Sequence, residues 1–308
     1  MACHVYRHHD RLGTILSAVT LIDLADGRAL DLQVTGPQDG TPLVLHHGTP
    51  GSLVRFRAVE EAVHRRGLRL VTYSRAGYGA STRKPGRTVA DIAADLEAVL
   101  DHLGAQRCVT LGWSGGGPHA LASAALLPGR VAGATSVAGV GPYGQDDLDF
   151  LAGMGEGNIE EFGAAIAGEP ELTAALDEAA VELRDAGAAE VVESMATLLP
   201  KVDLAALVGE GGDQLAAQVA EGMRNGAGGW IDDDLAFVRP WGFSVEDITV
   251  PVFLWQGDED LMVPFAHGRW LADRIPGAVA HLMPGEGHIS IFINRVDDVL
   301  DELVATLA

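Results

Sequence analysis

Short β-prone runs alternate with helical patterns along most of this chain, and one long segment interrupts the alternation. Before the interruption the runs that read as strands are 17–23, 28–35, 43–46, 68–73, 107–111 and 131–140, and the helical ones are 52–66, 89–103 and 115–127. The first two strands flank Ala25-Asp26-Gly27, a turn that predicts a hairpin. Strands that alternate with helices in this way form a mainly parallel sheet whose faces the helices cover.

The alternation stops near Gly141 and resumes at residue 250. Residues 142–241 are acidic, rich in alanine and glycine, and helical in their apolar period, with no convincing strand. The pattern then continues with strands at 250–256 and 279–283 and helices at 264–275 and 291–307. The sequence therefore predicts a core built from residues 1–141 and 242–308, with residues 142–241 inserted as a helical cap.

Composition narrows the class of protein. The 308 residues, 47% of them hydrophobic, are enough to bury a full core. The two cysteines, Cys3 and Cys108, suggest no disulfide framework, which fits a reducing compartment. Residues 1–10 lack the apolar core of a signal peptide, and glycines and prolines break up the uncharged run 108–129. We expect a cytoplasmic protein without a membrane segment.

The charge of the chain excludes nucleic acid as a partner. The formal net charge is −22, whereas phosphate recognition requires basic patches. Most of this charge lies in the predicted cap, where residues 146–234 hold 21 acidic and three basic residues. Two interpretations stay open, a solvated face or a field that disfavours anionic substrates. Asp232-Asp233-Asp234 is predicted to be a helix N-terminal cluster rather than a metal site.

A candidate nucleophile follows the strand at 107–111. Gly112-Trp113-Ser114-Gly115-Gly116 has the pattern Gly-x-Ser-x-Gly and leads into a helix. Such a turn strains the serine backbone and lifts its hydroxyl clear of the sheet, and the glycines remove the clashes that would forbid it. The next backbone N–H lies at a helix N-terminus, where negative charge is stabilised. We predict that Ser114 is a nucleophile.

A serine hydroxyl needs a base to take its proton, and the base needs a third group to orient it. Two loops leave the carboxyl ends of predicted strands, where open α/β sheets bind their ligands. The first loop contains Asp260, with Asp258 as the alternative acid, and the second contains His288. Asp260 is preferred because it lies deeper in its loop, just before the next helix. Ser114, Asp260 and His288 are therefore predicted to form a triad.

An oxyanion hole is predicted beside this triad. The segment from His47 to Gly51 leaves a buried strand and enters a helix whose first N–H groups are free. The backbone N–H groups of Thr49 and Gly115 are predicted to donate to a tetrahedral oxyanion. His46 and His47 are adjacent on an extended strand and diverge, so no metal site is expected there.

Together these motifs resemble the α/β-hydrolase superfamily over nearly the whole chain. The matching segments are His47-Gly48-Thr49-Pro50-Gly51, Arg75-Ala76-Gly77-Tyr78-Gly79-Ala80-Ser81, Gly112-Trp113-Ser114-Gly115-Gly116, Gly257-Asp258-Glu259-Asp260-Leu261-Met262-Val263-Pro264 and Gly287-His288. The resemblance implies the α/β-hydrolase fold and a serine hydrolase without a cofactor, with a helical cap inserted before the strand that carries the acid. Haloalkane dehalogenases and epoxide hydrolases use aspartate as the nucleophile, so Ser114 argues against both.

The expected reaction is hydrolysis of a neutral small-molecule carboxylic ester or lactone through an acyl-enzyme. An aminopeptidase of the proline-iminopeptidase type is the main alternative, because a carboxylate in an acidic cap can bind a substrate ammonium. A thioesterase, a carbon–carbon bond hydrolase and a non-catalytic binding protein on the same scaffold stay open. A small-molecule substrate is the expected partner, and nothing in the sequence indicates an oligomeric state.

Aromatic residues beside the nucleophile and at the two junctions of the cap are candidates for the substrate pocket. They are Trp113, Tyr143, Trp230 and Trp241, with Phe243 as a further candidate. Packing between core and cap is an equally good explanation for those at the junctions.

Overall fold

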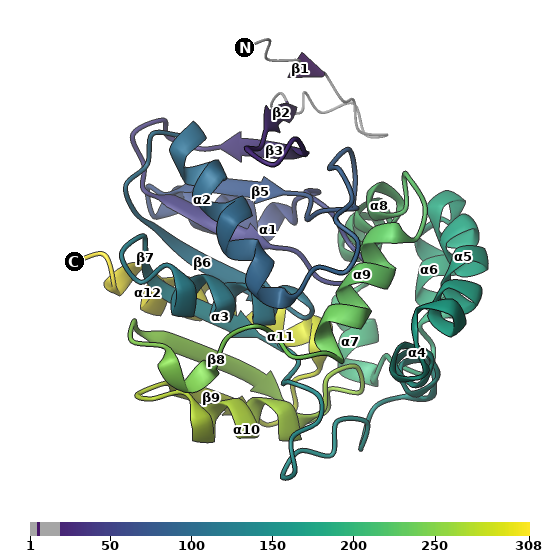
Figure 1. Ribbon diagram of the computed structural model, residues 1–308. Helices are drawn as coiled ribbons and strands as arrows, with labels where there is room; N and C mark the ends of the chain where they lie inside the picture. Colours follow the sequence, from purple (N-terminus) through teal and green to yellow (C-terminus); the bar gives the residue numbers. More distant parts are fainter. Residues whose placement is uncertain (1–4, 7–18) are drawn as a thin grey trace.

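A nine-stranded sheet lies at the centre of the molecule, and helices cover both of its faces (Figure 1). The computed structural model describes residues 5–6 and 19–308. The strands are β1 (Val5–Tyr6), β2 (Val19–Asp23), β3 (Ala29–Thr35), β4 (Pro42–His46), β5 (Arg69–Tyr73), β6 (Cys108–Trp113), β7 (Val131–Val137), β8 (Val252–Gly257) and β9 (Val279–Met283). Their order across the sheet is β1-β2-β3-β5-β4-β6-β7-β8-β9.

The strands from β4 to β9 run parallel to one another, while β1, β2 and β3 form an antiparallel edge in which β3 pairs with β5. The predicted parallel sheet and the predicted hairpin, now β2 and β3, are both confirmed. Residues 17–18 of the first predicted strand, and Cys3, lie outside the described residues.

Two layers of helices sandwich the sheet. The core helices and 3₁₀ turns are α1 (Arg57–Arg65), η1 (Val89–Asp91), α2 (Ile92–His102), α3 (Gly116–Leu126), η2 (Val245–Asp247), α10 (Phe265–Arg274), α11 (His288–Asn294) and α12 (Val296–Ala305). Side chains alternate along each strand, so Leu43 and Leu45 pack into the cluster that includes α1 and α12. Val44, between them, packs into the cluster that includes α2, α3 and α10.

Two predicted helices have different bounds in the structure. The helix predicted at 52–66 begins only at Arg57, because hydrogen bonding holds the preceding residues in a loop; the Ser52 hydroxyl lies 2.6 Å from that of Ser74. The helix predicted at 291–307 is two helices, α11 and α12, and α11 begins at His288. A carboxylate from the cap, described below, caps this early start.

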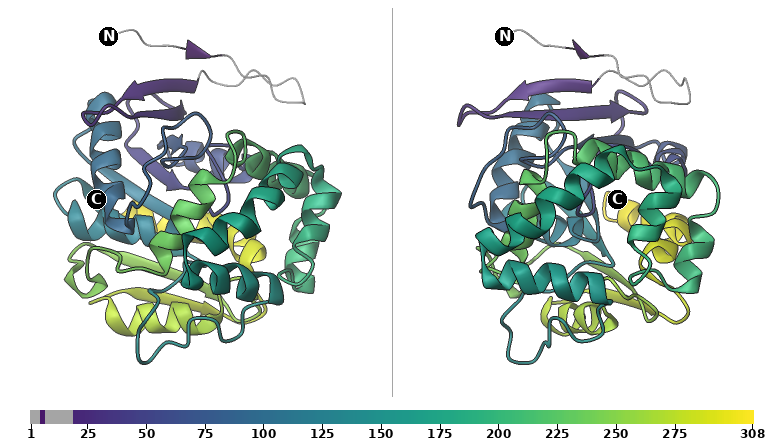
Figure 2. Two further views of the ribbon diagram at one scale, coloured as in Figure 1. Left: turned by 45° about the vertical axis from the view of Figure 1, so that its right-hand side comes forward. Right: turned by 90° about the vertical axis from the view of Figure 1, so that its right-hand side faces the viewer.

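The cap consists of six helices between β7 and β8, within residues 142–241, all of which the structure describes. They are α4 (Glu156–Ala167), α5 (Glu169–Asp185), α6 (Ala188–Ser194), α7 (Lys201–Ala206), α8 (Glu210–Gly222) and α9 (Gly228–Phe237). In the right-hand view of Figure 2 these helices face the viewer, to one side of the sheet. No helix in the described part of the chain is long and apolar enough to cross a bilayer.

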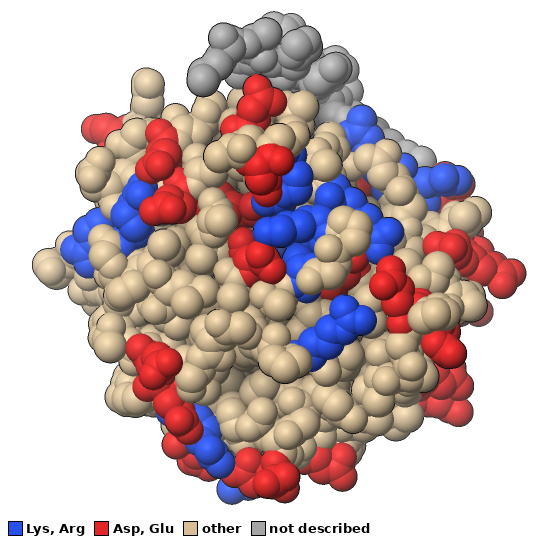
Figure 3. Space-filling view, viewed as in Figure 1, with Lys and Arg blue, Asp and Glu red and all other residues tan. Residues whose placement is uncertain are grey.

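The acidic residues of the cap divide into two groups. Many lie on the outside, and in Figure 3 red side chains gather at the edge where α5 and α6 lie. Asp203 and the run Asp232-Asp233-Asp234 are buried instead. The run lies in the middle of α9 rather than at its N-terminus, so that prediction is wrong. The buried Arg75 and Arg87 pair with Asp233, and Arg83 pairs with Asp232.

Candidate active site

Ser114 lies on a sharp turn between β6 and α3, with a φ of 57°. This left-handed conformation is strained for a residue with a Cβ and persists only where close packing holds it. Two glycines allow that packing. A Cβ on Gly116 would lie 2.0 Å from the backbone oxygen of His46, and one on Gly112 would lie 2.2 Å from the Gly116 oxygen. The strained turn expected from the sequence is present.

His288 and Asp260 are bonded to each other in the interior. Nδ1 of His288 lies 2.8 Å from Oδ2 of Asp260, and both side chains are buried. Asp260 accepts three further hydrogen bonds, from Gln256 Nε2 at 3.0 Å and from the backbone N–H groups of Met262 and Val263 at 2.9 Å. The carboxylate is thereby fixed in direction, and it selects the tautomer of His288 that carries its proton on Nδ1.

A cap carboxylate holds the helix that carries His288. Asp203 of α7 accepts hydrogen bonds from the backbone N–H groups of His288 at 2.8 Å, Ile289 at 2.9 Å and Ser290 at 2.8 Å. These donors are the first N–H groups of α11, which have no partner within the helix. The Asp203 carboxylate lies close to the backbone of Gly287, because a Cβ on this glycine would lie 2.5 Å from either carboxylate oxygen.

The pKa of His288 is raised above its ordinary value. Burial lowers it, but the charge and hydrogen bond of Asp260 and the charge of Asp203 raise it by more. Burial in turn raises the pKa of Asp203, which the backbone hydrogen bonds and His288 partly offset. The protonated imidazole is therefore stabilised in this site, as a base requires once it has taken a proton.

Ser114 and His288 line one cavity of about 700 Å³ between the core and the cap. The Ser114 hydroxyl has no hydrogen-bond partner among the described residues; catalytic hydrogen bonds often tighten only when substrate binds. Trp113 helps to fix His288, because its indole N–H donates to the His288 carbonyl at 3.1 Å and its ring stacks on Phe292. The three residues of the predicted triad thus come from three loops to one side of one cavity.

Thr49 and Gly115 lie side by side beside Ser114. A Cβ on Gly115 would lie 2.3 Å from the Thr49 hydroxyl oxygen, and both residues line the cavity. Gly115 is the N-cap of α3, so its N–H has no partner within the helix, and its carbonyl lies 2.8 Å from Nδ1 of His119. The Gly115 N–H thus lies at the N-terminus of α3, and Thr49 approaches it from the loop before α1.

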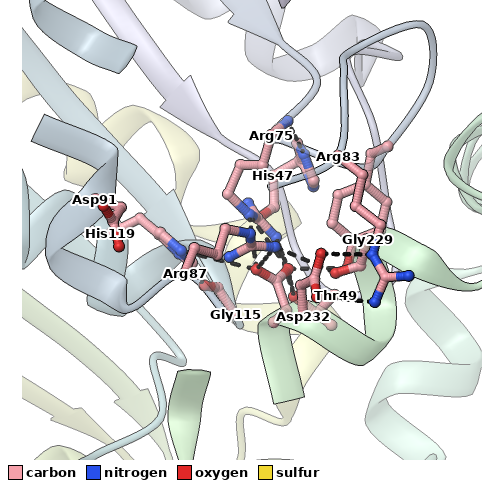
Figure 4. Close-up of polar contacts among 12 residues, drawn as sticks. His47, Thr49, Arg75, Arg83, Arg87, Asp91, Gly115, His119, Gly229 and Asp232 are labelled. Carbon is pink, nitrogen blue, oxygen red and sulfur yellow. Dashed lines mark hydrogen bonds and ion pairs between the residues drawn. The ribbon is translucent and has the colours of Figure 1, made fainter. Parts of the chain in front are cut away.

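A buried ion pair fixes the loop that contains Thr49. Arg75 donates to the carbonyl oxygens of His47 and Gly48 and, at 3.0 Å, to the Thr49 hydroxyl. The same guanidinium binds Asp233 of α9 at 2.6 Å, and the Thr49 hydroxyl donates to Asp233 at 2.6 Å. Figure 4 shows Arg75 and Thr49 converging on α9.

Asp233 joins further parts of the core to the cap. Arg87 lies 2.7 Å from one of its oxygens, and the Tyr78 hydroxyl donates to the other at 2.8 Å. Burial alone would raise the pKa of Asp233, but Arg75 and Arg87 hold it well below its ordinary value. The carboxylate is therefore ionised and links the cap to the loop before α1.

The four aromatic residues predicted to line the pocket separate into two pairs. Trp113 and Trp230 line the cavity. Tyr143 is 38% exposed and packs against Phe150, outside the cavity lining. Trp241 is buried against Phe243 and donates to the Phe237 carbonyl, also outside the lining. For Tyr143 and Trp241 the structure thus supports packing rather than pocket lining.

The alternative acid, Asp258, is exposed and accepts a hydrogen bond from the Gly285 N–H at 2.7 Å, which ties the two loops together. His46 and His47 are buried with separate partners: Nδ1 of His46 lies 3.0 Å from the Tyr73 hydroxyl, and Nε2 of His47 accepts from the Arg75 N–H. Burial lowers the pKa of His46 to about 3, so both positions serve packing.

Several residues of the site escaped sequence reasoning. Asp203, Asp233, Asp234 and Glu161 were part of an acidic segment in which nothing separates buried carboxylates from solvated ones. Arg75 was part of a matching motif but had no assigned role. The one available signal was the run of three aspartates beside Trp230 in an apolar helix, since solvated charges seldom fall in the middle of such a helix.

Comparisons with known proteins agree with this geometry. The family model of the alpha/beta hydrolase fold matches residues 41–294. A non-heme chloroperoxidase of Streptomyces lividans is 32% identical over 148 residues, 47% of this chain and 54% of that protein. The chain thus matches about half the length of that relative. An uncharacterized hydrolase of Bacillus subtilis is 26% identical over 271 residues, which are 86% of this chain and 89% of that protein.

Solved structures give the same result for the fold. An esterase from a Rhodococcus species superposes with a TM-score of 0.65, at 23% identity, covering 94% of this chain and 99% of that one. At this level of identity the likeness concerns the fold alone. Because the family model spans most of its length, this chain belongs to the alpha/beta hydrolase fold family.

Proposed function

We propose that this protein hydrolyses a small-molecule carboxylic ester or lactone through an acyl-enzyme on Ser114. His288 takes the proton of the Ser114 hydroxyl as the oxygen attacks the carbonyl carbon. Asp260 keeps the imidazole oriented and stabilises its positive charge. The N–H groups of Thr49 and Gly115 hold the oxyanion, and each such donor lowers a barrier by about 2.7–4 kcal/mol. His288 then gives the proton to the leaving group and activates water for deacylation.

The observation that carries the proposal is the Asp260–His288 pair of 2.8 Å beside a strained serine in one cavity. Strain at a non-glycine residue is maintained by the fold and points to a functional demand on that side chain. A binding protein without turnover has no need of a buried histidine in the same cavity as that serine, with Asp260 bound to its ring and Asp203 bound to its backbone.

The proposal is tested by comparing the wild type with Ser114→Ala on p-nitrophenyl acetate, with circular dichroism to check that the variant is folded. We expect turnover in the wild type and a loss of at least about 10³-fold in the variant. A fluorophosphonate probe should add its mass to a peptide containing Ser114, and Ser114→Ala should stay unlabelled. Equal turnover by both proteins, or labelling elsewhere, would refute the assignment.

A further inference from the structure

The cavity that holds Ser114 is acidic. The described residues that line it include no lysine or arginine. They include five carboxylate residues, namely Glu161, Glu182, Asp185, Glu190 and Asp234. Much of the remaining wall is apolar. A cavity of this composition repels anionic substrates, and no lysine or arginine in its described lining balances a buried carboxylate.

Glu161 and Asp234 lie together in this wall, and we call them the carboxyl pair. Asp234 comes from α9 and is fully buried, while Glu161 comes from α4 and accepts a hydrogen bond from the Trp230 indole N–H at 2.8 Å. Neither side-chain oxygen of Asp234 has a hydrogen-bond partner among the described N–H and O–H groups. The group beside it is the Glu161 carboxyl, which can donate only when it carries a proton.

The protonation of the carboxyl pair follows from its surroundings. Burial and the neighbouring Glu161 raise the pKa of Asp234 well above its ordinary value, and burial raises the pKa of Glu161. Asp233 raises the pKa of Asp234 further. Arg87 lowers it, but that guanidinium is already paired with Asp233 at 2.7 Å. Two adjacent carboxyls titrate as a unit, so without a cation beside it the pair retains a shared proton to a higher pH than an ordinary carboxyl does.

We propose that the carboxyl pair binds an ammonium group of the substrate, so that the preferred substrate is an ester bearing a protonated amine at a distance from the scissile bond. This inference rests on the proposed function, because it assigns the substrate class of the same site.

An ammonium matches the carboxyl pair in both charge and hydrogen bonding. It brings three N–H donors to a pair in which neither Asp234 oxygen has one, whereas a hydroxyl brings one donor and no charge. A cation between the two groups also lets both carboxyls ionise, so binding releases the retained proton to solvent. Apolar side chains elsewhere in the cavity, such as Phe162, Leu183 and Val219, suit the hydrocarbon between the ammonium and the ester.

Two esters of equal size separate charge from shape. Methyl 6-aminohexanoate and methyl heptanoate differ by an ammonium in place of a methyl group, and a pH-stat follows the hydrolysis of both. We expect the wild type to prefer the amino ester in kcat/KM, and this preference to fall by about tenfold or more in Asp234→Asn and in Glu161→Gln. Glu182→Gln, which removes an exposed carboxylate from the same cavity lining, is the matched control and should keep the wild-type preference.

An equal fall in Glu182→Gln would attribute the preference to the general field and overturn the role of the carboxyl pair. Equal kcat/KM values of the wild type for the two esters would overturn the role of the carboxyl pair directly, without reliance on any variant.

Binding without turnover tests the same inference independently of catalysis. Titration calorimetry of n-hexylammonium chloride and of 1-hexanol, each in two buffers of different ionisation enthalpy, measures affinity and proton release. We expect hexylammonium to bind about tenfold more tightly and to release a proton, and Asp234→Asn to abolish both effects. If this is seen while neither ester is hydrolysed, the proposed function fails and the ammonium site stands. If both esters are hydrolysed without preference and the two ligands bind alike, the ammonium site fails and the proposed function stands.

Discussion

Replacing Asp203 by asparagine removes a negative charge beside His288 while keeping most of the side chain. The carboxylate accepts three backbone hydrogen bonds of 2.8–2.9 Å at the start of α11. Helix N-cap residues contribute about 0.5–2 kcal/mol, and a buried N–H left without a partner costs about 1–3 kcal/mol. We therefore expect Asp203→Ala to lower the free energy of unfolding by about 3 kcal/mol and Asp203→Asn, which keeps one acceptor oxygen, by about 1 kcal/mol.

The pH dependence distinguishes a positioning role from a purely structural one. Asp203 is one of the groups that raise the pKa of His288, and the neutral imidazole is the form that accepts the serine proton. Removing the charge lowers the pKa of His288, so the acid limb of the kcat/KM profile of Asp203→Asn should move to lower pH. A lower kcat should accompany the shift, because α11 is less firmly held.

The measurement is kcat/KM for p-nitrophenyl acetate from pH 5 to 9, together with thermal unfolding. Asp177→Asn is the matched control, since it removes an exposed cap carboxylate on α5. Asp177→Asn should have the same acid limb of the kcat/KM profile and the same melting temperature as the wild type. An acid limb in Asp203→Asn that coincides with that of the wild type would refute the reasoning, even if the variant were less stable.

Three further variants test other parts of the site. Gly116→Ala places a Cβ 2.0 Å from the His46 oxygen, so we expect a loss of about 3 kcal/mol or more in chemical denaturation, whereas the exposed Gly129→Ala should cost little. Asp233→Asn leaves two buried arginines without a counter-charge and should cost about 3–5 kcal/mol; in protein that remains folded at low temperature, kcat should fall more than KM rises. Asp234→Asn should stabilise the protein, because a carboxyl whose pKa is raised by folding destabilises the folded state as the pH rises through that pKa. The gain in melting temperature should therefore be larger at pH 8 than at pH 5. No gain at either pH would contradict the unpartnered state of Asp234.

The core of the fold was predictable because its signals are local. Each parallel strand is a short apolar run with helical periodicity on either side, and covering helices force that pattern on a buried sheet. The turn at Ser114 was readable for a similar reason, because close backbone approach at Gly112 and Gly116 admits no other residue. Asp260 and His288 followed from their positions after the ends of strands, which the topology brings to one edge.

The interior of the cap was not predictable, since its contacts are long-range. Whether a carboxylate on a helix is solvated or buried depends on what lies across from it. Asp203 is separated from its partners on α11 by more than eighty residues, and Asp233 from Arg75 by still more. The start of α11 at His288 was missed for the same reason, because its cap comes from another part of the chain. Tyr143 and Trp241 were predicted to line the pocket because they lie at the junctions of the cap, but in the structure both pack outside the cavity lining.

The three consecutive aspartates of α9 have a consequence for protein engineering. Successive residues of a helix point about 100° apart, so the three side chains leave α9 in three directions. Asp232 binds Arg83 at the surface, Asp233 binds Arg75 and with it the loop of Thr49, and Asp234 lies in the cavity wall. A single turn of helix thus binds the cap to the core, supports the loop of Thr49 and contributes to the cavity wall. Exchanging this insertion for that of a relative would therefore require transplanting the matching arginines as well, and a library that varies α9 for new selectivity should leave its first two aspartates untouched.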